Sequence, residues 1–272
     1  MDGKALADRI RAEVAEEVKE LGNVGLSTIL VGDDPASDTY IRLKHKAAIE
    51  VGIAARDYRL AEDTSEAGLL ELIAQLNADD GVDGILVQLP LPPQIDEHQA
   101  IEAVDPAKDV DGFHPINAGK LLLGHEGLVA ATPTGIMALL DEYDVQLEGA
   151  DAVIVGRSNI VGKPVSILLL ARHATVTICH SRTADLGAHT RTADVLVVAV
   201  GQAGLVTPEM VKEGATVVDV GMNRTDESLR GDVDPAVVEK VGLITPVPGG
   251  VGPMTIASLL RNTVRAARLR RW

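Results

Sequence analysis

Tyr40 and Lys44 are the residues near the start of the chain whose types and spacing best suit acid–base chemistry. They stand four positions apart in a predicted helix, so they share one face. Phenol and amine groups both serve enzymes as proton donors and acceptors. The pattern Tyr-x-x-x-Lys is also common on ordinary helix surfaces, so on its own a solvated pair stays an equal alternative.

Three further features favour a reaction site over a surface pair. The helix follows the turn Gly32-Asp33-Asp34-Pro35 and so begins at the carboxyl end of a strand, where sites in α/β proteins gather. Gln88 closes another apolar strand just before Pro90, and residues 108–113 form an acid-rich loop. His114 follows that loop and is interpreted as a packing or solvated residue rather than a catalyst.

The segment from Pro248 to Ile256 holds three glycines between two prolines and indicates a wall of bare backbone. Both residue types are costly inside helices and strands, and an ordinary turn needs only one or two of them. Such a loop lets a flat ligand lie against the main chain. The last helix is expected over residues 255–270, which places the loop amides at its N-terminus.

A second glycine turn, from Gly156 to Gly162, joins a predicted strand to a predicted helix. Backbone N–H groups and the helix N-terminus can approach a pyrophosphate there. Ser158 stands where the pattern G-x-G-x-x-G has its second glycine, so the turn alone equally suits a plain connection. Gly201 and Gly221 each follow a strand, and we expect them to let a nicotinamide pass close to the backbone.

The next strand ends in the residues 179–183, Cys-His-Ser-Arg-Thr, and carries no acid at its tip. Sites for NAD usually place Asp or Glu there to hold the ribose hydroxyls. Arg157, Ser181 and Arg182 instead suit a 2′-phosphate, whose charge an acid would repel. The sequence therefore favours NADP, although Arg182 as a solvated surface residue stays open.

Apolar runs and their spacing predict two halves in which helices and strands alternate. The first half has predicted helices over 6–21, 37–51 and 65–77 and strands over 26–31, 54–60 and 84–89. The second has a helix over 133–143 and strands over 152–155, 174–179, 195–199 and 215–220. The fold class is α/β, with two α/β domains and a cleft between them. The second domain is predicted to be Rossmann-like, with a doubly wound parallel sheet.

Composition narrows the classes of function. The formal net charge of −15 argues against a broad nucleic-acid surface, and no apolar run is long enough for a membrane span. The start of the chain lacks an apolar signal region, and Cys179 is the one cysteine, so we expect a cytoplasmic protein. The seven histidines show no ligand spacing, so no metal is predicted. The basic segment from Arg265 to Arg271 is interpreted as a solvated helix end.

Taken together, these segments resemble the bifunctional methylenetetrahydrofolate dehydrogenase/cyclohydrolase family, also called FolD, over nearly the whole chain. Both signature regions are present, one from Glu71 to Leu91 and the other from Pro248 to Ile256. The resemblance implies NADP-dependent oxidation of 5,10-methylenetetrahydrofolate to 5,10-methenyltetrahydrofolate and hydrolysis of the latter to 10-formyltetrahydrofolate, in one-carbon metabolism and purine precursor supply. It implies a folate-binding catalytic domain of residues 1–131 plus 253–272, an NADP-binding domain of residues 132–252, and a homodimer.

Position by position, the resemblance assigns Lys44 as the general acid/base of hydrolysis, with an amine whose pKa burial would lower, and Gln88 as the group that holds it. Tyr40 would stack on the folate rings, and Asp111 would accept hydrogen bonds from the pterin. These four residues form the predicted catalytic set. The predicted substrate site comprises Tyr40, Gln88, Asp111, Pro248, Gly249 and Val251. The predicted cofactor site comprises Gly156, Arg157, Ser158, Ile160, Gly162, Ser181, Arg182, Gly201 and Met222.

Two other functions stay open on the sequence. One is a dehydrogenase without cyclohydrolase activity, against which the presence of Lys44 and Gln88 argues. The other is a non-catalytic NADP-binding module, which leaves the Tyr–Lys pair and the glycine wall unexplained. Thr134 stands where a basic residue is expected; this change should weaken a contact to the cofactor or the glutamate tail without abolishing the chemistry.

Overall fold

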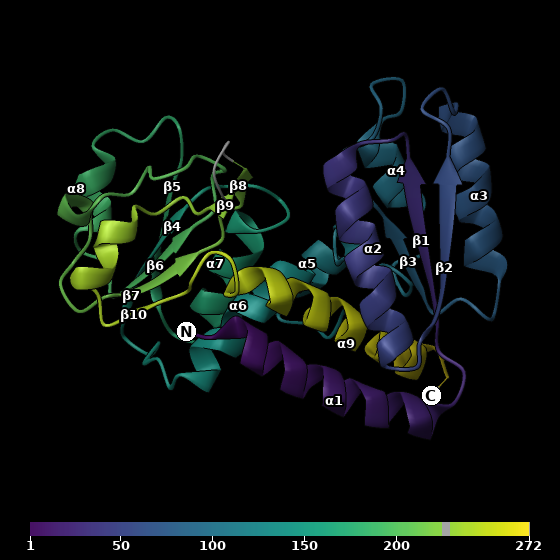
Figure 1. Cartoon of the computed structure of the whole chain (residues 1–272), viewed down its shortest axis with the longest axis horizontal. Helices are drawn as coiled ribbons and strands as arrows, with labels where there is room; N and C mark the ends of the chain where they lie inside the picture. The colour runs from purple at the N-terminus through teal and green to yellow at the C-terminus, as the bar shows by residue number, and fades with distance from the viewer. Residues whose placement is uncertain (225–228, 272) are drawn as a thin grey trace. The chain divides into compact units, whose positions relative to one another are not determined.

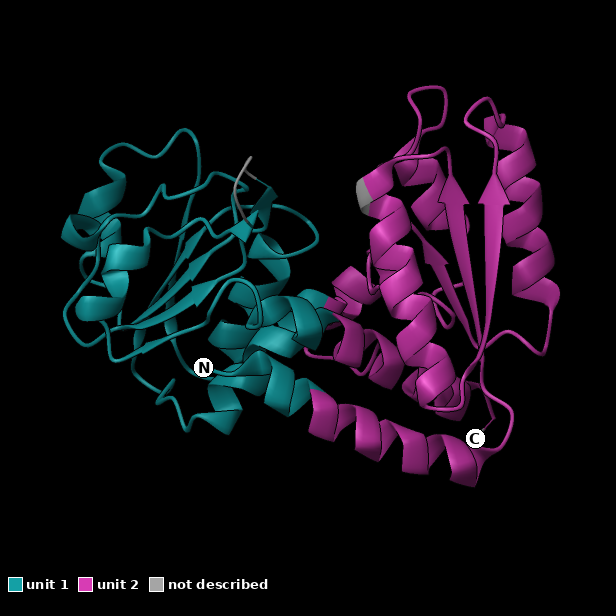
Figure 2. Cartoon of the chain, viewed as in Figure 1, with its two compact units in different colours: residues 1–7, 132–255 teal, residues 8–131, 256–272 magenta. Residues whose placement is uncertain are grey.

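The structure of the protein is a computed structural model that describes residues 1–224 and 229–271. It divides into two compact units, each built around its own parallel sheet (Figures 1 and 2). Unit 1 comprises Met1–Ala7 and Thr132–Thr255, and unit 2 comprises Asp8–Ala131 and Ile256–Trp272. The predicted α/β fold class with parallel sheets is confirmed.

Unit 2 holds a three-stranded sheet in the order β2-β1-β3, with every pair parallel. Its strands are β1 (Gly25–Val31), β2 (Ala54–Leu60) and β3 (Gly84–Val87), and its connecting helices are α2 (Pro35–Glu50) and α3 (Glu66–Ala78). All seven residues of β1 are buried, as expected for a central strand covered on both faces, and Ser27 and Thr28 are its polar members. The chain passes from β1 to β2 on one side and then to β3 on the other side of β1. A ligand site is therefore expected where the carboxyl ends of β1 and β3 lie next to each other.

Helices cover both faces of this sheet. On one face, α3 and α4 (Glu97–Ala103) bury Ile73 and Ala100 against Ile29 and Ile85 of the strands. On the other face, α2 packs against β1 and β2, and Thr263 of α9 (Val251–Arg271) lies beside Gly84. The unit also contains most of α1 (Gly3–Leu21), together with α5 (Pro115–Leu123).

The helices α2 and α3 begin one or two residues away from their predicted starts, because each begins directly after a side chain that caps it. Asp34 is the N-cap of α2 and accepts a hydrogen bond from the backbone N–H of Ser37 at 2.7 Å, so the helix begins at Pro35, two residues before its predicted start. Ser65 caps α3 in the same way through the N–H of Gly68. Side-chain caps thus fix both starts more sharply than the apolar period does.

The last helix begins at Val251, so the predicted start at residue 255 was wrong. Gly252 and Pro253 occupy the first turn of α9. Backbone N–H groups in a first turn have no intrahelical acceptor, so a proline there removes no hydrogen bond. The loop of bare backbone is therefore shorter than the sequence suggested and ends at Gly250.

The basic end of α9 is partly solvated, since Arg268 and Arg271 are exposed, but two of its arginines also bind a buried acid. Asp83 lies just before β3 and is 1% exposed. Its carboxylate accepts hydrogen bonds from Arg270 at 3.1 Å and Arg271 at 2.9 Å. The two arginines therefore fasten the C-terminal helix to the start of β3 in unit 2.

Unit 1 holds a five-stranded parallel sheet in the order β10-β7-β6-β4-β5. Its strands are β4 (Asp151–Val155), β5 (Thr175–Cys179), β6 (Val195–Val198), β7 (Thr216–Asp219) and β10 (Leu243–Ile244), and its helices are α6 (Ala131–Glu142), α7 (Gly162–Ala171) and α8 (Leu186–Thr190). This order is a doubly wound one, in which the chain starts at β4 and moves to either side. The carboxyl ends of β4 and β6 are therefore the expected ligand position.

The shortest elements of unit 1 were not predicted. They are the antiparallel pair β8 (Asn223–Arg224) and β9 (Leu229–Arg230), the 3-10 helices η1 (Pro208–Met210) and η2 (Pro235–Glu239), and the edge strand β10. Elements of two to five residues are too short to show a hydrophobic period. Among the helices of residues 1–224 and 229–271, none has both the length and the apolar content that a membrane span requires.

Candidate active site and cofactor site

Lys44 and Gln88 meet at the carboxyl ends of β1 and β3. Lys44 lies on α2, the helix that follows β1, and only 8% of it is exposed. Its Nζ donates to Gln88 Oε1 at 3.2 Å, while Gln88 Nε2 donates to the carbonyl of Leu89 at 2.7 Å. The second contact fixes which way the amide points. The structure therefore brings together two residues 44 positions apart and aims the amide oxygen at the amine.

Lys108 anchors the acid-rich loop beside β3. The residue is 1% exposed, and its Nζ donates to the carbonyls of Leu76, Asn77 and Asp79 at 3.0, 2.7 and 2.8 Å. These carbonyls belong to the C-terminal end of α3, where a cation is favourable. Its own carbonyl accepts from the N–H of Ile85 at 2.8 Å, so the loop starts as an extension of the sheet.

Asp109 shapes the rest of this loop. Its carboxylate is 5% exposed and accepts from the backbone N–H groups of Gly112, Phe113 and His114 at 3.1, 3.2 and 2.8 Å. It also accepts from Asn117 Nδ2 at 2.9 Å. Neither Lys108 nor Asp109 was predicted as a site residue, because a loop carries no period that marks its buried members.

His114 is structural, in agreement with its interpretation from the sequence. It is the N-cap of α5, and its Nδ1 accepts from the N–H of Ile116 at 3.0 Å. Its Nε2 lies 3.2 Å from the carbonyl of Glu102. Both ring nitrogens therefore serve the local fold.

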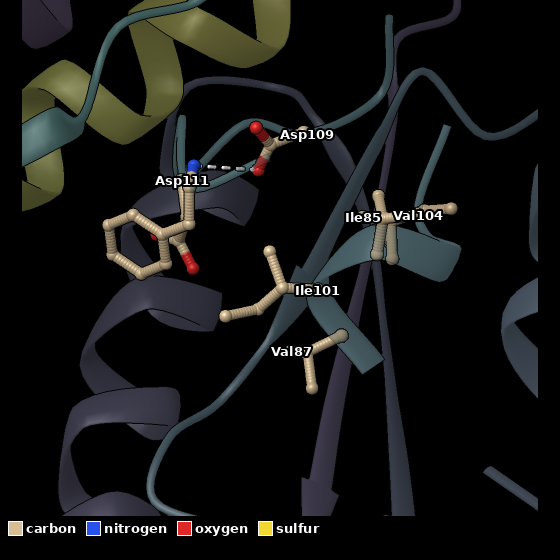
Figure 3. A pocket seen from close by; sticks show the side chains of 7 residues that line it. Ile85, Val87, Ile101, Val104, Asp109 and Asp111 are labelled. Carbon is tan, nitrogen blue, oxygen red and sulfur yellow. Dashed lines mark hydrogen bonds between the residues drawn. The ribbon is translucent and has the colours of Figure 1, made fainter. Parts of the chain in front are cut away.

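Asp111 lies two residues beyond Asp109 and lines a small cavity in unit 2 (Figure 3). The cavity has a volume of about 10 Å³, close to what one water molecule requires. It is lined by Ile85, Val87, Ile101, Val104, Asp109, Asp111 and Phe113. Burial raises the pKa of Asp111 to about 6; the charge of Lys44 opposes this rise, and that of Asp109 adds to it. The amine and the carboxyl are thus electrostatic neighbours.

Tyr40 lies one helical turn before Lys44 on α2 and is half-buried. Burial raises the pKa of its phenol above the ordinary value, so the hydroxyl stays protonated near neutral pH. Unit 2 therefore gathers Tyr40, Lys44, Gln88 and Asp111, the four residues predicted as the catalytic set.

The glycine loop before α9 lies in unit 1, where part of it packs against the start of the chain. A Cβ on Gly3 would overlap the carbonyl oxygen of Gly250, and Lys4 donates its N–H to the carbonyl of Gly249 at 3.0 Å. Gly249 itself has a φ of 109°, and an added Cβ would meet only Pro246 Cγ, at 3.9 Å. Gly250 is therefore bare because the chain packs there, whereas Gly249 is bare toward open space.

The other predicted members of this wall differ in exposure. Pro248 is exposed, while Val251 is 4% exposed and begins α9. Only the backbone of Val251 is thus placed to face a ligand. Met222 is 41% exposed, and its Sδ would lie 3.4 Å from a Cβ on Gly252, beside the same helix start.

The turn from β4 into α7 is formed by close backbone packing. Gly156 has a φ of 127°, and a Cβ on it would overlap the carbonyl oxygen of Ala199. A Cβ on Gly162 would in turn overlap the carbonyl oxygen of Gly156. Ser158 Oγ accepts from the N–H groups of Val161 and Gly162 at 3.1 and 3.4 Å. The two glycines therefore let the turn pack closely against backbone, and the Ser158 hydroxyl lies at the N–H groups where α7 begins.

Residues 157–160 of the same turn are exposed to solvent. Arg157 and Ser158 are exposed, and Ile160 is 42% exposed. Gly156 donates its N–H to the carbonyl of Cys179 at 2.8 Å, which joins this turn to the end of β5. The glycine turn and the tip of β5 are thus adjacent at one edge of the sheet.

The tip of β5 presents a hydroxyl and a cation. Ser181 and Arg182 are exposed and follow Cys179 directly beyond the strand. The nearest following acid, Asp185, is the N-cap of α8 and accepts from the N–H of Ala188 at 3.0 Å. Its carboxylate is therefore engaged by the next helix.

Two buried acids that the sequence analysis missed hold the loops after β6 and β7. Asp232 accepts from the backbone N–H groups of Val200, Gly201 and Gln202 at 2.7, 3.0 and 2.8 Å. Asp219 accepts from the N–H groups of three further residues, Gly221, Asp232 and Val233. Burial raises the pKa of Asp219, against the effect of these three donors. In the sequence, the only sign of these two buried acids is a glycine within two positions of each of them.

Of the two glycines expected to face a nicotinamide, one has open space and the other does not. Gly201 has a φ of 68° and nothing within 4 Å of an added Cβ. A Cβ on Gly221 would overlap the carboxylate of Asp232. The expectation for Gly221 is therefore corrected, because its missing side chain makes room for a buried acid.

These features define a two-unit α/β protein with a buried lysine site on one sheet and a dinucleotide-type glycine turn on the other. The chain belongs to the tetrahydrofolate dehydrogenase/cyclohydrolase family. Residues 1–111 match the catalytic domain of that family, and residues 130–271 match its NAD(P)-binding domain.

Individual relatives agree over nearly the whole chain. The bifunctional protein FolD of Halothermothrix orenii is 58% identical, with 98% of this chain and 97% of that protein covered. The crystal structure of the bifunctional enzyme FolD from Campylobacter jejuni is 52% identical, covers 99% of this chain and 98% of its own, and superposes with a TM-score of 0.97. The Trypanosoma brucei methylenetetrahydrofolate dehydrogenase-cyclohydrolase, complexed with NADP and an inhibitor, is 40% identical, covers 100% and 98%, and has a TM-score of 0.96.

The family predicted from the sequence is confirmed by these matches. So are the predictions of a bifunctional dehydrogenase and cyclohydrolase in one-carbon folate chemistry and of a nicotinamide dinucleotide cofactor.

Proposed function

We propose that this protein oxidises 5,10-methylenetetrahydrofolate with NADP and hydrolyses the resulting 5,10-methenyltetrahydrofolate to 10-formyltetrahydrofolate, with Lys44 as the acid/base of the second step. The observation that carries this proposal is the Lys44–Gln88 contact of 3.2 Å at the carboxyl ends of β1 and β3. A nearly buried amine aimed at an amide oxygen, with a carboxyl beside it, is suited to proton transfer rather than to solvation.

Hydrolysis makes the clearest demand on these side chains. Water adds to the methenyl carbon and loses a proton to give a carbinol. The ring C–N bond then breaks as the carbinol hydroxyl loses its proton to form the formyl C=O and the ring nitrogen takes up a proton, so that one proton is released overall. Lys44 would accept the first proton and return one to the nitrogen. Gln88, with its Nε2 held by the Leu89 carbonyl, would keep the amine in position through its oxygen.

Asp111 and Tyr40 are proposed to hold the folate. A carboxylate accepts hydrogen bonds from the amino and ring N–H groups of a pterin, and a half-buried phenol ring offers a flat stacking surface. Pro248, Gly249 and the backbone of Val251 are proposed as the wall beside the substrate. The open face of Gly249 supports this assignment, and the buried side chain of Val251 limits its part to the main chain.

The residues of unit 1 fit a nicotinamide dinucleotide. Gly156 and Gly162 allow a closely packed turn between β4 and α7, and Gly201 leaves open backbone at the end of β6. When bound, the cofactor accepts a hydride from the methylene carbon, a step that needs positioning rather than an acid or base. Gly156, Ser158, Ile160 and Gly162 would hold the pyrophosphate half, and Gly201 and Met222 the nicotinamide half.

Preference for NADP is proposed to come from Arg157, Ser181 and Arg182. The hydrogen bond from Gly156 to Cys179 makes the first of these residues a neighbour of the other two along the edge of the sheet. A 2′-phosphate is best recognised by guanidinium and hydroxyl donors. The engagement of Asp185 as a helix cap supports the same preference, because it keeps a carboxylate away from the phosphate.

The same proposal includes the domain boundaries, the oligomeric state, the location and the metabolic role of the protein. Residues 1–131 plus 253–272 are proposed as the folate domain and residues 132–252 as the NADP domain. A homodimer is proposed through the nucleotide-binding half, since β5 is an edge strand of its sheet and carries the exposed Ile178. Cytoplasmic residence and supply of purine precursors complete the proposal.

The test is an absorbance assay with 5,10-methylenetetrahydrofolate and either NADP or NAD, following the appearance and decay of the methenyl compound. We expect oxidation with a clear preference for NADP, followed by hydrolysis. Combined Arg157→Ala and Ser181→Ala changes should reduce that preference by tenfold or more. A methenyl product that accumulates without hydrolysis would instead indicate a dehydrogenase alone, and unchanged NADP affinity in the double variant would refute the phosphate assignment.

A further inference from the structure

The exposed tip of β5 is closed into a rigid turn by the side chains at its two ends. Thr183 Oγ1 accepts the backbone N–H of His180 at 2.8 Å, and the N–H of Thr183 donates to the carbonyl of His180 at the same distance. His180 Nδ1 accepts the N–H of Arg182 at 3.1 Å. A side-chain hydrogen bond also links Thr183 to the Cys179 thiol. Thr183 and His180 thus engage the main chain from both ends of the turn.

The two residues between them are left free to face outward. Thr183 and His180 are half-buried, whereas Ser181 and Arg182 are exposed. Because the backbone N–H groups of His180, Arg182 and Thr183 are all engaged within the turn, their directions are fixed. The side chains of Ser181 and Arg182 therefore leave a main chain that is already ordered.

We propose that Thr183 and His180 are positioning residues that set the preference for NADP over NAD, by holding Ser181 and Arg182 ready for the 2′-phosphate. This inference rests on the proposed function, in which Arg157, Ser181 and Arg182 recognise that phosphate. Neither Thr183 nor His180 needs to contact the cofactor. They act by ordering the turn before NADP binds, so that binding does not have to supply the entropy cost of ordering it.

This role differs from a general structural one in what it should change. NAD carries a hydroxyl where NADP carries the phosphate, so a loosened turn removes a strong contact from NADP and almost nothing from NAD. Loss of one buried hydrogen bond together with the ordering of two side chains corresponds to about a five- to twentyfold change in affinity. The change should appear in the ratio of the two affinities.

The experiment compares Thr183→Val with Thr183→Ser in the full-length protein. Valine keeps the shape but removes the hydroxyl that accepts the His180 N–H, while serine keeps the hydroxyl. Dissociation constants for NADP and NAD are measured by calorimetry, and the melting temperature of each variant is recorded. Thr192→Val is the matched control, because Thr192 has an exposed hydroxyl that donates to the His189 carbonyl in the same unit.

We expect Thr183→Val to weaken NADP about five- to twentyfold with little change for NAD, and Thr183→Ser and Thr192→Val to bind both as the parent does. If Thr183→Val does not fold, His180→Leu and His180→Asn supply the same contrast. Asparagine can offer an oxygen to the Arg182 N–H, and leucine cannot.

Two outcomes overturn the inference. One is an equal loss of NADP and NAD affinity in Thr183→Val, or in His180→Leu. The other is an unchanged ratio in those variants while Arg157→Ala with Ser181→Ala lowers it. An unchanged ratio in the Arg157 and Ser181 double variant is a different result, because it refutes the proposed phosphate site itself.

Discussion

The two sheets of this protein share a strand order but use it differently. In β2-β1-β3 of unit 2 and in β5-β4-β6 of unit 1, the first strand lies between the second and the third. In unit 2, Lys44, Gln88 and Asp111 lie near the carboxyl ends of β1 and β3. In unit 1, the equivalent ends carry Gly156 and Gly201. One topology thus presents reacting groups in one unit and bare backbone in the other.

A repeated tripeptide shows how such a difference arises locally. Asp109-Val110-Asp111 and Asp232-Val233-Asp234 both begin with a buried acid that binds three backbone N–H groups, followed by a buried valine. The last acid differs. Asp234 caps η2 through the N–H of Ala236, whereas Asp111 lines a cavity near Lys44. The first two residues build the loop, and the surroundings of the third decide its role.

The largest expected effect tests whether unit 2 supplies the reacting group. Lys44→Met should lower the hydrolysis of supplied 5,10-methenyltetrahydrofolate by about 10²–10⁴-fold, the usual contribution of a general acid/base. Lys46→Met is the control, because Lys46 lies on the same helix with its side chain 74% exposed. Rates are read from the loss of methenyl absorbance. Equal rates in the two variants would remove Lys44 from the reaction.

The next effect tests whether unit 1 binds the cofactor through its glycine turn. Gly156→Ala combines a φ of 127° with overlap of the Ala199 carbonyl, so the turn must move. We expect NADP affinity to fall more than tenfold while methenyl hydrolysis is retained. Gly149→Ala has a φ of 79° but open space, and separates backbone strain from crowding. Calorimetric titration is the measurement, and equal losses in both variants would mean that crowding at Gly156 is unimportant.

A smaller effect concerns the pH dependence of folate binding. The pKa of Asp111 is raised to about 6, so its carboxylate is present above that pH and is protonated below it. Since the proposed pterin contact needs the carboxylate, KM for the folate should rise about tenfold for each pH unit below 6 and level off above 7. Asp111→Asn should give a high KM without that rise. A wild-type KM that stays constant between about pH 5 and about pH 7.5 would count against the assignment.

The smallest effect concerns stability and sharpens the contrast in how the sheets are held. Arg271→Ala removes one of the two arginines that bind Asp83 and should lower the free energy of unfolding by about 1–2 kcal/mol. Arg268→Ala, whose ion pair with Glu17 is more exposed, should change it by less than about 0.5 kcal/mol. Denaturant unfolding compares the two. A larger loss for Arg268→Ala would contradict the role given to Asp83.

Much of the fold was predictable because buried strands are rich in apolar residues and turn residues mark where strands end. The strand β2 was predicted with its observed bounds, and β1 within one residue. The start of α9 was not, because glycine and proline were taken to exclude a helix, although a first turn has no N–H acceptors to lose. The Lys44–Gln88 contact was expected from the family resemblance, and topology supported it only by bringing the carboxyl ends of neighbouring parallel strands to one edge.

The rest of the site could not be predicted, because it depends on which loop acids become buried. Asp109 and Asp232 are distinguished from exposed acids only by the backbone donors that converge on them. Those donors come from loops without a repeating pattern, and for Asp232 they lie about 30 positions away in the chain. Gly221 was assigned to the cofactor for the same reason, since nothing in the sequence shows that Asp232 fills the space beside it.

The central claim is that unit 2 carries the hydrolytic lysine while oxidation depends on the bare backbone of unit 1. The most direct test is a progress curve of Lys44→Met with 5,10-methylenetetrahydrofolate and NADP, recording NADPH and the methenyl compound together. The account predicts that the two products appear in equal amounts and that the methenyl compound then persists. Decay of the methenyl compound at the wild-type rate would contradict it.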